Sequence, residues 1–203
     1  YEEYDLDFVN HLRGMFAIAI WDEKKNRIIL ARDRLGVKPL YYHIKNNKLL
    51  FASELKVLLK HHEINPTINR NAISDYLTYL YVPAPETIFN EIKKLRPAEI
   101  LVFNLDGNFF TKRYWNVEFQ NSKQDEGDCA KQLRNLLEES IDLRMVSDVP
   151  VGILLSSGID SSLVATLATK KSDDKLNTYT VGFEDIADSS YDELKESKDM
   201  ANI

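Results

Sequence analysis

Apolar residues in the first sixty positions occur in short, strand-length runs that polar turns separate. The runs 15–22 and 26–33 flank three charged residues, and the runs 39–44 and 48–53 flank Lys45–Asn47. Short apolar runs joined by polar turns are typical of consecutive strands. The pattern therefore predicts two β-hairpins, which suggest a layered, β-rich domain.

Two helices and a third hairpin are predicted next. Ser53 is placed to cap a helix at 54–60, with Glu54 in its first turn, where the helix dipole favours an anion. Apolar residues between Ala72 and Tyr81 recur at helical spacing, and the prolines at positions 83 and 85 would end that helix. The run 99–115 is a hairpin pattern with Asp106-Gly107 at its turn.

From about Asp125 onward, helical and strand patterns alternate. Apolar residues at helical spacing predict an amphipathic helix that reaches roughly Met145. A buried strand is expected at 149–155, a further strand at 176–183, and helices at 160–171 and 191–203. Strands that alternate with helices predict a parallel sheet with right-handed crossovers. The fold class is thus α+β followed by α/β, and we divide the chain into 1–62, a connecting helix and hairpin at 63–124, and 125–203.

Composition and charge exclude several classes of protein. The chain has 203 residues, of which 44% are hydrophobic, and a net charge of −6. This acidity argues against a general binder of nucleic acid or anionic membranes. No apolar run approaches the roughly 20 residues that span a bilayer. A single cysteine precludes an internal disulfide, so we expect a cytoplasmic protein. Because residue 1 is tyrosine and not methionine, we expect the sequence to be either an excerpt or a processed product.

The densest chemistry lies in the stretch "LLSSGIDSS", Leu154–Ser162. It follows a predicted strand and enters a predicted helix, so it lies where open α/β sheets bind ligands. The helix N-terminus suits a phosphate, and Gly158 lets the backbone approach it. The serine hydroxyls add donors at Ser156, Ser157, Ser161 and Ser162. Asp160 is either a helix cap or a ligand of Mg²⁺ on a nucleotide. The alternative is a polar strand-to-helix turn with Asp160 as its cap.

Other phosphate and nucleophile motifs do not occur. The sequence has no G-x-x-x-x-G-K-[ST], no G-x-G-x-x-G and no G-x-S-x-G around Ser156. The four histidines, at positions 11, 43, 61 and 62, are all far in sequence from Leu154–Ser162, which is called the serine loop from here on. A Ser-His-Asp hydrolase is therefore not favoured.

The loop resembles the S-G-G-x-D-S pyrophosphate loop of ATP pyrophosphatase (adenine nucleotide alpha hydrolase-like) domains. Several longer stretches resemble, in the same order, glutamine-hydrolysing asparagine synthetases. These stretches are "LRGMFAIAIWDEKKNRIILARDRLGVKPLYY", "LLFASELKVLL", "ISDYLTYLYVPAPETIF", "SDVPVGILLSSGIDSSLVA" and "YTVGFED". The resemblance covers nearly the whole chain, and residues 116–128 are its weakest part.

The resemblance implies the end of an Ntn-hydrolase (class II glutamine amidotransferase) domain at 1–62 and the start of an ATP pyrophosphatase domain at 125–203. In that family, glutamine supplies ammonia, ATP with Mg²⁺ adenylates the aspartate side chain, and ammonia displaces AMP. The pyrophosphate loop carries over to Ser156, Ser157, Gly158, Asp160 and Ser161, with Ser162 and Gly182 as further ATP-binding residues. Leu154 and Val181 match positions of the adenosine pocket, and Ser157 replaces the first glycine of the pair.

The glutaminase nucleophile of the family, an N-terminal cysteine, has no match here. Cys129 is the only thiol, and its place on an amphipathic helix predicts a buried core residue. We therefore assign no catalytic residue for glutamine hydrolysis to this chain, and we expect at most weak ATP binding. The later S-G-E-G-x-D-E segment of the family is also not matched.

Other interpretations stay open. One alternative is a family relative that amidates or cyclises another substrate, and another is a non-catalytic truncated or split subunit that acts only by docking to a partner. The expected partners are a second copy in a homodimer or a complementary segment. The charged turn Arg32–Lys38 is interpreted as a structural turn, with a place on the ammonia route as the alternative. The acidic residues Glu184, Asp185, Asp188, Asp192 and Glu193 are interpreted as a solvated loop and helix start, with a metal site as the alternative.

Overall fold

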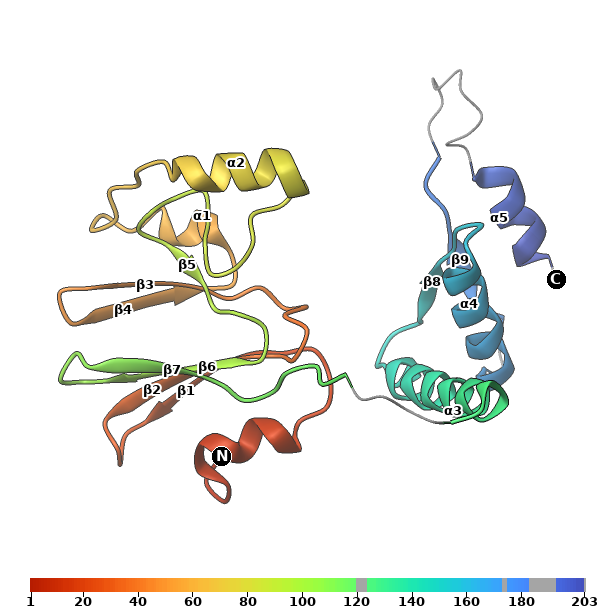
Figure 1. Cartoon of the computed structure of the whole chain (residues 1–203), viewed down its shortest axis with the longest axis horizontal. Helices are drawn as coiled ribbons and strands as arrows, with labels where there is room; N and C mark the ends of the chain where they lie inside the picture. Colours follow the sequence, from red (N-terminus) through yellow and green to blue (C-terminus); the bar gives the residue numbers. More distant parts are fainter. Residues whose placement is uncertain (120–123, 173–174, 183–192, 203) are drawn as a thin grey trace. The chain divides into compact units, whose positions relative to one another are not determined.

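The computed structural model describes residues 1–119, 124–172, 175–182 and 193–202. The chain forms two compact units, Tyr1–Phe119 and Gln120–Ile203. Figure 1 shows the helices and strands of both units. No helix among the described residues has the length and apolar character that crossing a bilayer requires.

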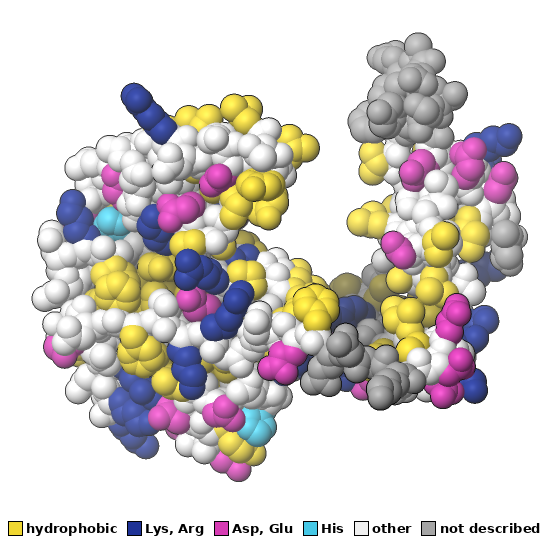
Figure 2. All heavy atoms as spheres, viewed as in Figure 1, with side chains coloured by type: hydrophobic (Ala, Val, Ile, Leu, Met, Phe, Trp, Pro, Cys, Tyr) yellow, Lys and Arg dark blue, Asp and Glu magenta, His cyan; other side chains and the backbone are white. Residues whose placement is uncertain are grey.

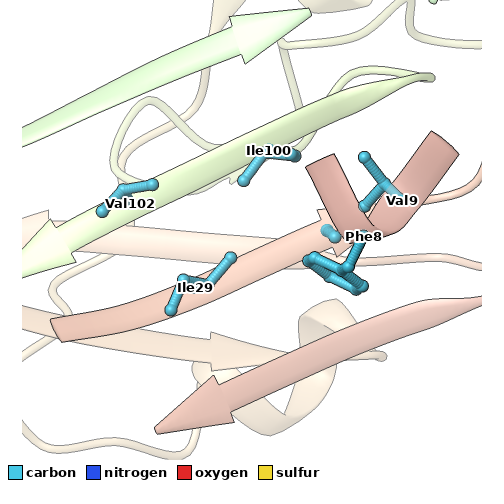
Figure 3. Packing of buried hydrophobic residues seen from close by; sticks show 6 residues of the cluster. Phe8, Val9, Ile29, Ile100 and Val102 are labelled. Carbon is cyan, nitrogen blue, oxygen red and sulfur yellow. The ribbon is translucent and has the colours of Figure 1, made fainter. Parts of the chain in front are cut away.

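An antiparallel sheet of four strands forms one layer of the first unit. Its strands are β1 (Ala17–Asp22), β2 (Arg27–Arg32), β6 (Glu99–Asn104) and β7 (Phe109–Arg113), in the order β1-β2-β6-β7. The two central strands pair with Ile29 opposite Val102 and Ala31 opposite Ile100. Because side chains alternate between the faces of a strand, these four residues share one face. The 3-10 helix η1 (Asp5–His11) packs Phe8 and Val9 against that face (Figure 3).

The opposite face of this sheet packs against a second sheet of three strands. This sheet has the order β4-β3-β5 and consists of β3 (Tyr41–Lys45), β4 (Lys48–Ala52) and the short β5 (Lys93–Lys94). Leu30 and Leu101 of the first sheet share a core cluster with Tyr42 and Leu49 of the second. Helices α1 (Leu55–Leu58) and α2 (Arg70–Tyr79) lie beyond the second sheet (Figure 1). The first unit thus has two stacked sheets with helical segments outside both.

The predicted hairpins of this unit are confirmed, but two helix ends are not where the sequence placed them. Ser53 does not cap α1, because the chain stays extended through Glu54 and the helix begins only at Leu55. Glu54 therefore lies before the first turn, and its carboxylate pairs with Lys56 at 2.6 Å. Helix α2 ends at Tyr79, where Leu80 takes a left-handed conformation with φ 61°. The helix thus stops before the prolines that were expected to end it.

Helix α2 begins with a side-chain cap that the sequence analysis did not identify. The Asn69 Oδ1 atom accepts hydrogen bonds from the backbone N–H groups of Asn71 and Ala72, which satisfies two donors of the first turn. Only Ala72 is buried on this helix. The other apolar side chains of α2 are exposed, and they belong to the hydrophobic surface that Figure 2 shows in yellow. The exposed residues are Ile73, Tyr76, Leu77 and Tyr79.

The connecting segment predicted at 63–124 does not lie between the two compact units. Strand β6 hydrogen-bonds to β2 in the middle of the first sheet, and β7 continues that sheet. Residues 63–119 therefore complete the core of the first unit. A pairing between strands about 70 positions apart has no local signal, and so the sequence pattern alone suggested a connection.

The second unit alternates helices and strands as predicted. Its elements are α3 (Glu126–Met145), β8 (Gly152–Leu154), α4 (Ile159–Lys171), β9 (Asn177–Tyr179) and α5 (Leu194–Ala201). Strands β8 and β9 are parallel, with Leu154 opposite Tyr179. The core cluster consists of Ile141, Ile153, Leu155, Ala165, Leu167 and Ala168. The strands are shorter than expected, and their burial is incomplete: Leu154 is 79% exposed and β9 is exposed throughout.

Cys129 is exposed, so the prediction that it is a buried core residue was wrong. Its Sγ atom lies 3.7 Å from the side-chain oxygen of Gln124. Among the described residues, α3 buries only Ile141, which lies near the other end of the helix. Helical spacing identified the apolar face of α3 correctly, but the core cluster covers only the end of that face.

Candidate functional site

The serine loop joins the end of β8 to the start of α4 and is fastened to the neighbouring strand. Leu155 donates its N–H to the Tyr179 carbonyl at 2.9 Å, which extends the parallel pairing by one residue. The Thr180 hydroxyl donates to the Leu155 carbonyl at 2.8 Å. The loop therefore leaves the carboxyl end of the parallel pair from a fixed starting point, where open α/β sheets bind their ligands.

The Ser161 hydroxyl is the centre of the hydrogen bonds within the loop. Its Oγ atom lies 2.7 Å from the Ser156 Oγ atom and accepts from the Ser156 N–H at 3.2 Å. It is also within bonding distance of the Ser156 and Gly158 carbonyls, at 3.0 and 3.1 Å. A hydroxyl has one proton and two lone pairs, so these two carbonyls are alternative acceptors. Residues 156–161 thus form a closed turn that two serine side chains hold together.

The N-terminus of α4 presents backbone N–H groups that the helix itself does not use. The first bond of the i to i−4 kind runs from the Ser162 N–H to the Gly158 carbonyl at 3.1 Å. The N–H groups of Ile159, Asp160 and Ser161 precede that bond and have no helical acceptor. The helix dipole places partial positive charge at the same point. This end of α4 is therefore suited to an anion.

An anionic oxygen already lies against one amide of the loop. The Ser157 N–H donates to the Glu193 Oε2 atom at 3.2 Å. The Gly158 N–H donates inside the loop, to the Ser156 hydroxyl at 3.2 Å. The carboxylate of Glu193 occupies the kind of position that a phosphate oxygen would take, since both are charged acceptors of a backbone N–H.

Asp160 lies in the first turn of α4 and does not cap the helix. The N-cap residue is Gly158, with no side-chain cap bond, so the capping alternative for Asp160 is wrong. The side chain is exposed, and within the described part of the chain it forms neither a hydrogen bond nor an ion pair. No group of three or more His, Cys, Asp or Glu side chains close enough to hold a metal occurs among the described residues. Asp160 is therefore an exposed carboxylate in the first turn of α4 that could contact a cation on a bound phosphate.

Two exposed apolar side chains border the loop. Leu154 ends β8 and is 79% exposed, and Val181 follows β9 and is 75% exposed. At position 182 a glycine is required by packing, because a Cβ atom there would come within 2.3 Å of the Leu194 Cδ1 atom. Gly182 thus permits the close approach of α5. The acidic residues between 184 and 192 lie outside the described residues.

The charged turn after β2 has a structural explanation. The Asp33 carboxylate is 1% exposed and accepts from the N–H groups of Leu35, Val37 and Lys38 at 2.9 to 3.2 Å. The Arg32 guanidinium donates to the carbonyls of Gly36 and Leu95, each at 2.6 Å. Both charged side chains therefore bind backbone groups of the turn, and Arg32 also joins the turn to Leu95, in line with the structural interpretation.

Tyr114 extends this network from the end of the first sheet. Its hydroxyl donates to the Arg32 carbonyl at 2.7 Å. Burial, and secondarily the nearby negative charge of Asp33, raise the pKa of Tyr114 to about 12. The turn and the end of β7 are therefore linked through a phenol that keeps its proton.

Comparison with known families divides the chain as the structure does. Residues 1–115 match the model of the glutamine amidotransferase domain, and residues 132–202 match the model of asparagine synthase. The chain belongs to the family of glutamine amidotransferase domains, whose model covers more than half of it. The first match covers most of the first unit, and the second contains the serine loop. The resemblance that the sequence motifs indicated is thereby confirmed.

Named relatives agree with this assignment. The chain is 40% identical over 191 residues to asparagine synthetase [glutamine-hydrolyzing] 3 of Bacillus subtilis, covering 91% of this chain and 31% of the relative. It is 36% identical over 198 residues to asparagine synthetase [glutamine-hydrolyzing] 1 of the same organism, covering 97% and 31%. A match to amidase chry2 of Gibberella zeae is 35% identical over 173 residues, covering 83% and 25%. The chain thus spans about a third of the asparagine synthetases or less.

Two residues that shape the loop were not predicted in that role. Thr180 fastens the Leu155 carbonyl, and Glu193 accepts from the Ser157 N–H. Glu193 was predicted to lie in a solvated loop and helix start, with a metal site as the alternative. Both contacts join residues at least 25 positions apart, so no local pattern could have indicated them.

Proposed function

We propose that the Leu154–Ser162 loop binds the β- and γ-phosphates of ATP in an enzyme that converts aspartate to asparagine. The similarity to relatives named glutamine-hydrolysing asparagine synthetases supports the product of this reaction. The observation that carries the proposal is the geometry of the loop. It is a closed serine turn at the carboxyl end of a parallel strand pair, and its Ser157 N–H already donates to an anionic oxygen at 3.2 Å. A phosphate oxygen would take the same kind of bond.

The proposed reaction places the developing charge on this loop. A carboxylate oxygen of aspartate attacks the α-phosphorus of ATP, and the bond from that phosphorus to the α,β-bridging oxygen breaks. Its electron pair leaves with the β- and γ-phosphates as pyrophosphate. The N–H groups of Ile159–Ser161 and the dipole of α4 favour the added negative charge. Because the Ser161 bonds fix the loop beforehand, little rearrangement is needed as the charge forms.

Asp160 is the residue that we propose to hold Mg²⁺. Magnesium commonly binds one or two carboxylates together with substrate phosphates, and it keeps several waters. The exposed carboxylate in the first turn of α4 fits that requirement. Bound magnesium would offset the charge of the phosphates.

Leu154 and Val181 are proposed to contact the adenosine. Both side chains are largely exposed at the end of the parallel pair, where an apolar ring would remove them from water. Gly182 was predicted to bind ATP as well. Its contact with Leu194 suggests instead that it acts by positioning α5.

For the first unit we propose the layered arrangement of an Ntn hydrolase, which supplies ammonia from glutamine. Its two stacked sheets with outer helical segments support this. Ammonia would attack the carbonyl carbon of the aspartyl adenylate, and AMP would leave. Cys129, the only thiol of the 203 residues, lies in the second unit, so we assign it no part in glutamine hydrolysis. A cytoplasmic location and a homodimer remain predictions.

A second candidate is that the same loop activates a different carboxylic acid, since the chain is also similar to a relative that is named an amidase and not an asparagine synthetase. Exchange of labelled pyrophosphate into ATP separates the two, because the exchange requires the acid that is adenylated. The assay would use the 203-residue chain with Mg²⁺ and ATP, with aspartate, glutamate or no acid added. Exchange that depends on aspartate supports the first candidate. Pyrophosphate binding without any aspartate-dependent exchange contradicts aspartate activation by this chain.

A further inference from the structure

The carboxylate on the serine loop comes from a distant part of the chain. Glu193 immediately precedes α5, and its Oε2 atom accepts from the Ser157 N–H, 36 positions earlier in the sequence, at 3.2 Å. Ser157 is one of the loop residues to which we assign the pyrophosphate. An acidic side chain of the protein thus uses a donor that the ligand would need.

We infer that Glu193 is an internal competitor for the pyrophosphate site. A backbone N–H has one proton, so Ser157 bonds well to either the carboxylate or a phosphate oxygen. The carboxylate and the phosphate are both negative, so their mutual repulsion close to one N–H group would add to the competition. Binding of the phosphates therefore requires the Glu193 side chain to move away. This inference rests on the proposed function of the loop.

Glu193 is not needed to hold α5 in place. It is the N-cap residue of α5, but its side chain makes no capping bond. The helix is held by Leu194, which lies against Gly182, by the buried Ser197, and by Met200, which packs on the core cluster. Because Glu193 is exposed, its bond to Ser157 exchanges with water and ligands at small cost. The carboxylate can thus leave the loop while α5 stays packed.

The test compares pyrophosphate binding, without Mg²⁺, by the wild-type chain and by E193Q and E193A, using isothermal titration calorimetry. E193Q removes the charge and keeps an acceptor, whereas E193A removes both. We expect E193Q to bind about three- to tenfold more tightly than wild type, the range for one charge-assisted bond at an exposed site. E193A should bind at least as tightly as E193Q. The matched control is E196Q, which removes the same charge from the exposed first turn of α5 and should leave the affinity within about twofold.

A second measurement reports the contact itself. The amide ¹H–¹⁵N signal of Ser157 should move in ligand-free E193A and stay in place in E196Q. Equal pyrophosphate affinity of wild type, E193Q and E193A would overturn the competition and leave the proposed function standing. Weaker binding by E193A would also overturn it, since Glu193 would then position the loop. If no variant binds pyrophosphate while circular dichroism shows folded chains, the phosphate site and the inference both fail.

Discussion

Replacement of Ser161 by alanine removes the centre of the serine loop. The Ser161 Oγ atom bonds to the Ser156 N–H and lies 2.7 Å from the Ser156 hydroxyl. Without it, the Ser156 N–H and the Ser156 hydroxyl must hydrogen-bond to water. The turn at residues 156–161 is then no longer held closed by two serine side chains. The amides of the loop would then have to be ordered by the ligand, which lowers its affinity.

The expected magnitude follows from the bonds that are lost. Two hydrogen bonds at a partly exposed site contribute about 1–2 kcal/mol together, so pyrophosphate should bind about 5- to 30-fold more weakly. The unfolding free energy should fall by no more than the same amount, about 1–2 kcal/mol, because the two bonds are lost from the folded chain and the freed groups can be hydrated. Affinity is measured by isothermal titration calorimetry, and stability by urea unfolding followed by circular dichroism.

The matched control for S161A is T166A. The Thr166 hydroxyl donates to the Ser162 carbonyl at 2.8 Å, within α4 and outside the loop. T166A therefore removes a hydroxyl from the same helix and should leave the affinity unchanged. If S161A binds pyrophosphate as well as wild type, the serine turn does not organise the site. An equal loss in T166A would show that the stability of α4, and not the loop, determines binding.

Three further predictions concern the two units separately. D33A should lower the unfolding free energy by about 2–4 kcal/mol, because three backbone N–H groups of the turn lose the buried carboxylate that accepts from them. Urea unfolding measures this, and E23A, at an exposed position, should change the unfolding free energy little. Because the pKa of Tyr114 is raised to about 12 in the folded state, above the usual value of about 10, the phenol stabilises the fold below about pH 10, and this contribution declines as the pH rises toward 12. Y114F should lose less stability over that interval, and an equal decline would contradict the assignment. C129S should leave the unfolding midpoint unchanged, and iodoacetamide should alkylate Cys129 in the folded chain at a rate near that of a free thiol, since the side chain is exposed.

Local signals predicted the elements of this fold better than their packing. The hairpins came from short apolar runs and turn residues, and Gly107 takes the positive φ of 91° that its turn requires. Helix ends were predicted less well. The residue that precedes a helix is determined by backbone geometry, and the sequence does not show whether α1 begins after Ser53 or after Glu54. The pairing of β2 with β6 has no local signal, and so the place of residues 63–119 in the first unit was missed.

The candidate site was predicted in part for the same reason. Its serines and glycine all lie within residues 156–162, so the sequence could predict their position between a strand and a helix. The sequence could not indicate that Ser156 and Ser161 bond to each other, which makes them loop-forming groups as much as ligand donors. It also could not indicate which apolar faces are covered. Cys129 and Leu154 both follow a core pattern and are exposed.

Binding of pyrophosphate to the serine loop is tested most directly by titrating the ¹⁵N-labelled 203-residue chain and following its amide signals. The signals of Ser157, Gly158 and the first turn of α4 should move together and saturate, with much smaller changes in the first unit. In S161A the same signals should move only at higher pyrophosphate concentrations. Loop signals that stay in place at millimolar pyrophosphate, or shifts confined to the first unit, would contradict a phosphate site at Leu154–Ser162.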